Sequence, residues 1–156
     1  MHEKFAHAIS SLHQKFESLQ TGPSFTYGEL PVQMPTSGVY MFSEESNHLY
    51  VGRSNRLRKR YFLHCRPGSR HNQASFAFKL AKESINAPTA NYKTGKDSRA
   101  GLALEPEFVA AFILAKERIR RMQYRYVEET DQTRQALLEA YCIIALSTPF
   151  NDFDTH

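Results

Sequence analysis

Two short apolar runs on either side of a polar turn indicate a β-hairpin near residue 45. The runs at 38–42 and 49–52 are rich in β-branched and aromatic residues, and 43–48 between them is polar. If the turn is centred on Glu45, antiparallel pairing sets Tyr40 directly opposite Tyr50. The two phenols would then project from one face of the sheet, with their Cβ atoms about 5 Å apart.

After the hairpin, the spacing of the inward positions changes to that of a helix. Leu57, Arg60, Tyr61 and His64 recur every three or four residues, so they fall on one helical face, for which Asn55 can serve as the N-cap. A cation and an imidazole on the inward face of a helix are costly to bury. We therefore expect Arg60 and His64 to have a function rather than only a packing role.

Further helices are predicted where apolar residues repeat every three or four positions. They cover 3–20, Asn72 to about Glu83, Pro106 to about Arg120, and Asp131 to Pro149. Residues 122–129 alternate in the manner of a strand. Residues 84–105 lack apolar periodicity and are predicted to form a flexible basic loop.

These elements predict an α/β fold with a small three-stranded antiparallel sheet flanked by helices. The strands, at 38–42, 48–53 and 122–129, belong to one domain that covers 37–156. Residues 1–36 add an amphipathic helix and an irregular lead-in. That helix either packs on the sheet, which is the default for a lone amphipathic helix, or forms the seam of a dimer.

The charge of the chain is distributed unevenly. The 156 residues carry a formal net charge of +4, but 53–82 contains no Asp or Glu. Its basic residues are Arg53, Arg56, Arg58, Lys59, Arg60, Arg66, Arg70, Lys79 and Lys82. A solvated helix face would interleave both signs of charge, so this interval indicates contact with a polyanion, and nucleic acid is the first candidate.

Composition also restricts the class of protein. An apolar content of 41% is ordinary for a globular chain. Cys65 and Cys142 are far apart and lack the spacing of zinc ligands. No apolar run is long enough to span a bilayer, and the N-terminus lacks a signal-peptide core. We expect a soluble, cytoplasmic protein that is a monomer or a homodimer.

The hairpin and the helix after it resemble a known signature. Gly38-Val39-Tyr40 and Tyr50-Val51-Gly52, followed by Arg60 and His64, are similar to the signature of the GIY-YIG nucleases, with a slightly shorter spacing between the tripeptides. That family places a metal-binding Glu in a C-terminal helix and an Asn just beyond it, which Glu139 and Asn151 match. The resemblance covers 37 to about 71 and 123–151.

The resemblance implies metal-dependent hydrolysis of a nucleic-acid phosphodiester, with DNA as the expected substrate. Glu139 would hold one Mg²⁺ or Mn²⁺, Arg60 would pair with the phosphorane, and Asn151 would brace the site. By resemblance Tyr40 is the base. A phenol is only about a thousandth ionised at pH 7, so about 4 kcal/mol must come from nearby positive charge or from a relay to His64.

Several alternatives remain open from the sequence. Tyr40, Tyr50 and His64 are all candidates for the group that accepts the proton. Glu139 is the only charged residue in 136–146, and a cation there is either a metal or the arginine of a structural ion pair. A catalytically inert nucleic-acid-binding module would share the fold. The residues expected to hold the nucleic-acid backbone are Arg53, Arg56, Arg58, Lys59, Arg66 and Arg70.

Overall fold

The computed structural model describes residues 1–85 and 99–153, and the chain divides into two compact units. The first unit comprises Met1–Arg60 and the chain from Met122 onward, and the second comprises Tyr61–Arg121. The predicted N-terminal segment 1–36 thus belongs to the same unit as the strands. Among the described residues, no helix has the length and apolar character needed to cross a membrane.

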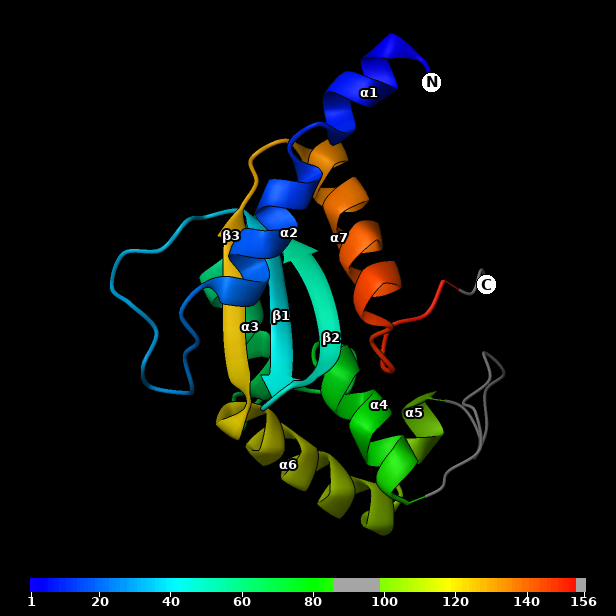
Figure 1. The fold of residues 1–156 in the computed structure, drawn as a ribbon. Helices are drawn as coiled ribbons and strands as arrows, with labels where there is room; N and C mark the ends of the chain where they lie inside the picture. Colours follow the sequence, from blue (N-terminus) through cyan, green and yellow to red (C-terminus); the bar gives the residue numbers. More distant parts are fainter. Residues whose placement is uncertain (86–98, 154–156) are drawn as a thin grey trace. The chain divides into compact units, whose positions relative to one another are not determined.

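The first unit contains an antiparallel sheet of three strands, which confirms the predicted α/β fold. Its strands are β1 (Gly38–Glu44), β2 (Asn47–Ser54) and β3 (Gln123–Glu128), and the order across the sheet is β2-β1-β3 (Figure 1). The central strand is therefore β1, which pairs with its hairpin neighbour on one side and with a strand from the C-terminal part of the chain on the other.

The predicted register of the hairpin is wrong, although the predicted face is right. Tyr40 lies opposite Gly52, and Tyr50 lies opposite Phe42, because a bulge follows Phe42. The turn is also tighter than expected, since Glu44 already pairs with Asn47. The register has shifted by two residues, so no side chain changes face. Tyr40 and Tyr50 are consequently diagonal neighbours, with 6.5 Å between ring centroids.

The absence of a side chain at Gly52 makes room for the ring of Tyr40. A Cβ atom built at this position would collide with the hydroxyl and ring carbons of Tyr40. Gly38 is constrained in a similar way, because its Cβ would meet the backbone carbonyl of Val127 on β3. Both glycines are thus required by close approach rather than by an unusual backbone angle.

One face of the sheet forms the core of the first unit. Helices α2 (Leu12–Thr21) and α7 (Gln132–Leu146) lie side by side over it (Figure 1). This core consists of Leu12, Leu19, Val39, Met41, Val51, Leu138, Cys142 and Ile143. The expectation that the N-terminal helix covers the sheet is confirmed for its second half.

The two terminal helices of this unit differ from prediction in detail. The predicted helix 3–20 is interrupted, because α1 (Glu3–Ile9) ends before α2 begins, and α1 has no buried residues. Asp131 caps α7 as expected by accepting a hydrogen bond from the amide of Arg134. The nearly uncharged run 136–146 would suggest a helix that is buried on most sides, but Ile144 on α7 is 70% exposed.

A buried carboxylate joins three elements of the first unit. Glu129, which is 1% exposed, accepts hydrogen bonds from Lys15 Nζ at 3.0 Å, Arg134 Nε at 3.2 Å and the Asp131 amide at 3.1 Å. Burial raises the pKa of Glu129, but the hydrogen bonds from Lys15, Asp131 and Arg134 outweigh it and lower the pKa overall.

Replacing Glu129 should therefore destabilise the fold in a pH-dependent way. We expect Glu129→Gln to lower the free energy of unfolding by about 2 kcal/mol at pH 7, the scale of hydrogen bonds to a charged group. Because the pKa of Glu129 is lower in the folded than in the unfolded protein, ionised Glu129 contributes fully to stability above the unfolded pKa of about 4.3. That contribution disappears as the pH falls through the folded pKa. Urea unfolding at pH 7 and below pH 4 measures the loss of stability and its dependence on pH.

The exposed neighbour Glu128 supplies the control variant, Glu128→Gln. Equal losses of stability in the two variants would contradict the role assigned to Glu129.

The second unit is helical. It contains α4 (Ser75–Ser84), α5 (Arg99–Leu102), α6 (Pro106–Arg121) and most of α3 (Leu57–Cys65), whose first residues belong to the first unit. Apolar spacing predicts an inward face for α4, and its members are all buried, namely Phe76, Ala77, Leu80 and Ala81. Phe78 packs on Phe108 with 5.0 Å between ring centroids. Ala74 rather than Asn72 occupies the N-cap position of α4. Within the predicted loop 84–105, residues 86–98 lie outside the described part, and 99–102 form a helical turn.

A lysine on the inner face of α6 was not predicted. Lys116 is buried, and its Nζ donates to the carbonyl oxygens of Pro67 at 2.6 Å and Ser69 at 2.9 Å. It also lies 4.6 Å from the centroid of the Phe112 ring. Burial, followed by the charge of Arg120, lowers the pKa of this amine. Lys116 thereby holds the turn after α3, which carries Arg66 and Arg70.

Candidate active site

The second face of the sheet is aromatic and holds the two signature tyrosines. It carries the side chains of Tyr40, Phe42, Tyr50, Tyr124 and Tyr126. Tyr40 lies in the middle of the central strand and is 1% exposed, and its ring lies 5.8 Å from that of Tyr124. Tyr50, on the hairpin's outer strand, is partly exposed.

Arg60 links these tyrosines to the start of α3. Its guanidinium forms side-chain hydrogen bonds with the hydroxyl groups of both Tyr40 and Tyr50. Two phenols and one planar cation therefore meet on the aromatic face, as the helical spacing of Arg60 predicted. The helix itself begins differently from expectation, because Asn55 does not act as an N-cap and instead accepts a hydrogen bond from Gln135 at 3.0 Å.

Burial makes both phenols even harder to ionise than a phenol in water. It raises the pKa of Tyr40 far above its ordinary value of 10, and the charge of Tyr50 raises it further, whereas Arg60 lowers it by a smaller amount. The pKa of Tyr50 is also raised, chiefly by burial and against the same effect of Arg60. Arg60 by itself therefore does not offset the effect of burial on the pKa of Tyr40.

Glu139 approaches the same cluster from α7. Burial raises the pKa of its carboxyl, while Arg53 lowers it. Its negative charge in turn raises the pKa values of Tyr40 and Tyr50, as expected for a carboxylate close to both. The side chain of Glu139 is 28% exposed, so it is only partly removed from water.

The ion-pair partner of Glu139 in this structure is an arginine. Arg53 Nε lies 3.0 Å from Glu139 Oε2, which is the ion pair that the sequence left open as an alternative to a metal. Glu139 Oε1 makes no hydrogen bond to the described part of the chain. One carboxylate oxygen thus remains available to another ligand.

Asn151 braces the edge of β2. Its Oδ1 accepts from the amide of Val51 at 2.8 Å and its Nδ2 donates to the carbonyl of Val51 at 2.8 Å. The hydroxyl of Thr148 also donates to Asn151 Oδ1, at 2.8 Å. Because these bonds use both ends of its amide, Asn151 holds the segment after α7 against the strand that carries Tyr50.

Asp152, which the sequence did not indicate as a site residue, also acts on the site. Asp152 is exposed, and its charge raises the pKa of Tyr50 after the larger effects of burial, Arg60 and Glu139. Its position beside Asn151 was the only signal that could have suggested this proximity. A second carboxylate therefore lies near the tyrosines in addition to Glu139.

His64 lies in the second unit, one helical turn beyond Arg60 on α3. It is buried, and its ring contacts that of Phe76 with 6.5 Å between centroids. The first unit thus brings together five of the six predicted positions. These are Tyr40, Tyr50, Arg60, Glu139 and Asn151.

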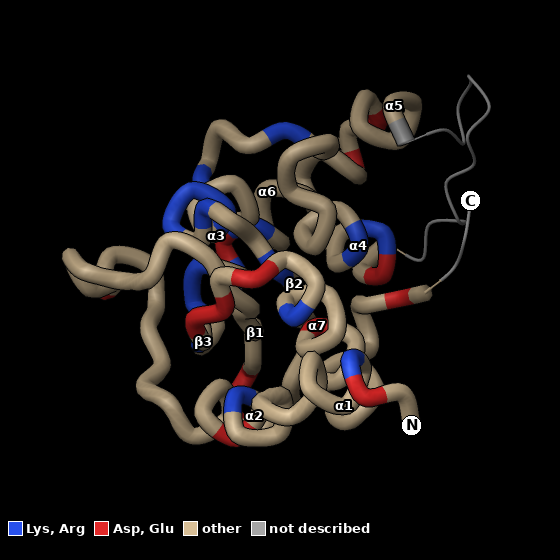
Figure 2. Tube along the Cα trace, turned by 90° about the horizontal axis from the view of Figure 1, so that it is seen from above, with Lys and Arg blue, Asp and Glu red and all other residues tan. Residues whose placement is uncertain are grey.

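The predicted nucleic-acid contacts include residues that already have structural roles. Arg53 pairs with Glu139, and Arg58 donates from its guanidinium to the carbonyls of Pro31 and Val32. Arg66 donates to the hydroxyl of Ser69 at 3.3 Å. The remaining members of the predicted set are exposed, and they are Arg56, Lys59 and Arg70. Lys and Arg gather around α3 in Figure 2.

A metal at this site would rely on very few protein ligands. Within residues 1–85 and 99–153, no three His, Cys, Asp or Glu side chains lie close enough together to hold an ion. Zinc sites need three or four such ligands. Mg²⁺ commonly keeps several waters and binds through one or two carboxylates together with substrate phosphate. Glu139, with Oε1 available, therefore fits Mg²⁺ or Mn²⁺ and does not fit zinc.

Comparisons of the chain with family models, with curated proteins and with solved structures found no match. The functional interpretation therefore rests on the residues and on their geometry.

Proposed function

We propose that the protein is a divalent-metal-dependent endonuclease of the GIY-YIG type that hydrolyses phosphodiester bonds of nucleic acid, with DNA as its expected substrate. The observation that supports this proposal most directly is that Arg60 and Glu139 both interact with the phenols of Tyr40 and Tyr50. These residues come from four different elements. A purely structural aromatic face does not require a guanidinium and a carboxylate beside its phenols.

Arg60 is the proposed electrophilic group. Its planar fork can bind two phosphate oxygens, and its interaction becomes stronger as negative charge develops in the transition state. Its hydrogen bonds to the two phenols hold it in place before substrate binds. An Mg²⁺ or Mn²⁺ ion held by Glu139 would polarise the scissile phosphate and stabilise the leaving 3′-oxygen.

The phenols are proposed to orient the attacking water. Hydrolysis forms a bond between the water oxygen and phosphorus and breaks the bond from phosphorus to the 3′-oxygen, while the water releases one proton. Because burial makes Tyr40 even harder to ionise, its phenol is protonated, and it can accept that proton only if it first loses its own. Tyr50 and His64 are the other candidate acceptors.

The ion pair between Arg53 and Glu139 is proposed to open when substrate binds. Arg53 is exposed at the edge strand, so its guanidinium can move from the carboxylate to a phosphate of the backbone. This exchange would release Glu139 Oε2 for the metal. The pair therefore has a role in the free protein without excluding the metal in the complex.

The same ion pair favours a second candidate function, a nucleic-acid-binding module without catalysis. In such a module Arg53 would neutralise Glu139 permanently and no metal would be needed. A plasmid-nicking assay in Mg²⁺, in Mn²⁺ and in EDTA separates the two functions. Metal-dependent nicking supports the nuclease, and binding without nicking under all three conditions supports the inert module.

Binding of DNA should weaken steeply as salt is added. Each neutralised phosphate adds about one unit to the slope of log K against log salt concentration. We expect Arg56→Glu and Lys59→Glu each to lower that slope by about one unit, because both side chains are exposed next to the site. Lys4→Glu, an equal charge change on α1, is the control. If all three variants keep the wild-type slope, the nucleic-acid surface lies elsewhere.

A further inference from the structure

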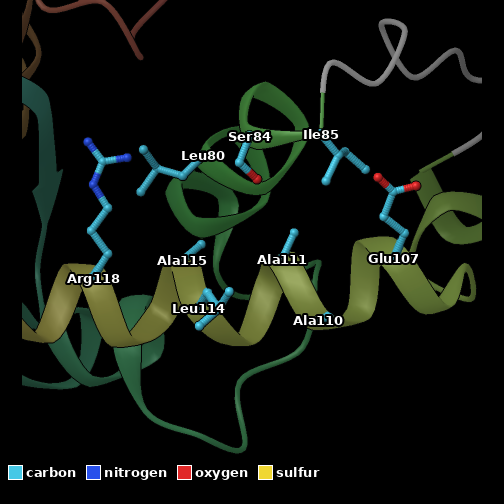
Figure 3. Close-up of a pocket in the computed structure, with 9 residues that line it drawn as sticks. All are labelled: Leu80, Ser84, Ile85, Glu107, Ala110, Ala111, Leu114, Ala115 and Arg118. Carbon is cyan, nitrogen blue, oxygen red and sulfur yellow. The ribbon is translucent and has the colours of Figure 1, made fainter.

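The second unit carries an apolar groove that the proposed nuclease site does not use. It lies between α4 and α6, has a volume of about 400 Å³, and is lined mainly by apolar atoms (Figure 3). Leu80 and Ile85 line it from the side of α4. The residues from α6 are Glu107, Ala110, Ala111, Leu114, Ala115 and Arg118.

These six residues form one face of α6. Their spacing alternates between three and one, which keeps them on a single stripe of the helix. Ala111 and Ala115 are buried, whereas Leu114 is 62% exposed and stands beside the groove without being covered. The face thus offers a protruding leucine next to a hollow with small side chains.

The charges on this face have opposite signs at its two ends. Glu107 lies at one end of the groove and Arg118 at the other, as Figure 3 shows. They are eleven positions apart in the helix, a distance of about 16 Å along the axis. Glu107 is exposed and makes no ion pair within the described residues.

The side chains on this face of α6 are self-complementary when two copies of the helix pack antiparallel. If the two-fold axis passes between Phe112 and Ile113, Glu107 lies opposite Arg118 of the partner subunit. Ala110 then lies opposite Ala115 of the partner subunit. The same alignment sets Leu114 opposite Ala111 of the partner subunit. Each leucine therefore meets the small residues of the facing groove, and each acid meets a base.

We propose that this face is a symmetric homodimer interface, in which α6 of each copy packs antiparallel on α6 of the other. A second copy accounts for the charges as well as for the apolar groove. A small apolar ligand would account only for the groove, and a partner of another kind would have no reason to match the register. The alanines allow the helices to approach closely, and burial of the two leucines supplies the main stabilisation.

The first test measures the oligomeric state of the full chain by sedimentation velocity over a range of concentrations. We expect a monomer–dimer equilibrium that shifts toward dimer as concentration rises. Leu114→Glu should abolish the dimer, because it places a charge in the groove of the partner. Ile113→Glu is the matched control, since Ile113 is 49% exposed on the same helix but does not line the groove, and this variant should still dimerise.

The second test uses charge reversal to check the register in which the two copies of α6 pair. Glu107→Arg or Arg118→Glu alone should weaken dimerisation about tenfold or more, because like charges then face each other at both ends of the interface. The double variant Glu107→Arg and Arg118→Glu should return to the wild-type dissociation constant, since every pair is again opposite in sign. Circular dichroism confirms that each variant is folded.

Three outcomes overturn the proposal. The first is a wild-type protein that stays monomeric at every concentration. The second is a dimer that survives Leu114→Glu but is broken by Phe5→Glu in α1, which would place the interface on the exposed N-terminal helix. The third is a double charge variant that remains as weak as the single ones, which would exclude antiparallel register.

Discussion

Glu139→Gln should abolish cleavage of DNA in Mg²⁺ while leaving DNA binding intact or slightly tighter. The amide keeps the shape of the side chain but removes the carboxylate proposed to hold the metal, along with a negative charge that would face phosphate. Loss of turnover to the level without metal is therefore expected. Nicking assays at saturating enzyme, together with a binding titration in Ca²⁺, separate the two effects.

Arg53→Gln provides the comparison that identifies the role of Glu139. It breaks the same ion pair but retains the carboxylate, so it should weaken binding and keep metal-dependent cleavage at saturation. Two results would show that Glu139 is only a structural partner of Arg53. One is cleavage by Glu139→Gln at the wild-type rate, and the other is an equal loss of stability in both variants with no effect of metal.

Tyr40→Phe should reduce turnover by about a hundredfold or more, with little change in substrate affinity, because a positioned proton-transfer group typically contributes that much. The ring still fills the space opposite Gly52, so the variant should fold. Tyr124→Phe is the matched control, since Tyr124 is equally buried on the same face and lies outside the predicted set.

A double variant shows whether Tyr40 and His64 act together. If they form a relay, Tyr40→Phe combined with His64→Ala should be hardly slower than either single variant, because residues that act as a unit are not additive. If the losses of turnover in the two single variants multiply in the double variant, Tyr40 and His64 have separate roles. A fully active Tyr40→Phe enzyme would remove this phenol from the reaction and leave Tyr50 and His64 as candidate bases.

The sequence predicted the faces of the sheet better than its register. Alternation in β1 and β2 depends only on whether a residue number is odd or even, so the tyrosines were placed on one face correctly. The bulge after Phe42 had no local signal, because it depends on the buried Ser43, whose hydroxyl bonds to His48 at 2.8 Å. Only the folded hairpin shows that pairing.

Charge partners were the least predictable part of the site. Arg53 and Glu139 lie on different elements, and nothing in their sequence spacing favours one arginine over another as the partner. The raised pKa of Tyr40 had no signal in the sequence for a related reason, since its burial in the aromatic face depends on β3, which comes from far along the chain. By contrast, the place of Arg60 followed from helical spacing alone.

The strand order has a consequence for synthesis on the ribosome. The hairpin of β1 and β2 is complete by residue 54, but β3 begins only at residue 123, after the whole second unit has been made. During elongation the central strand β1 therefore has an unpaired edge, which is a template for pairing with other nascent chains. Expression at low temperature or with chaperones that shield this edge should therefore favour soluble product.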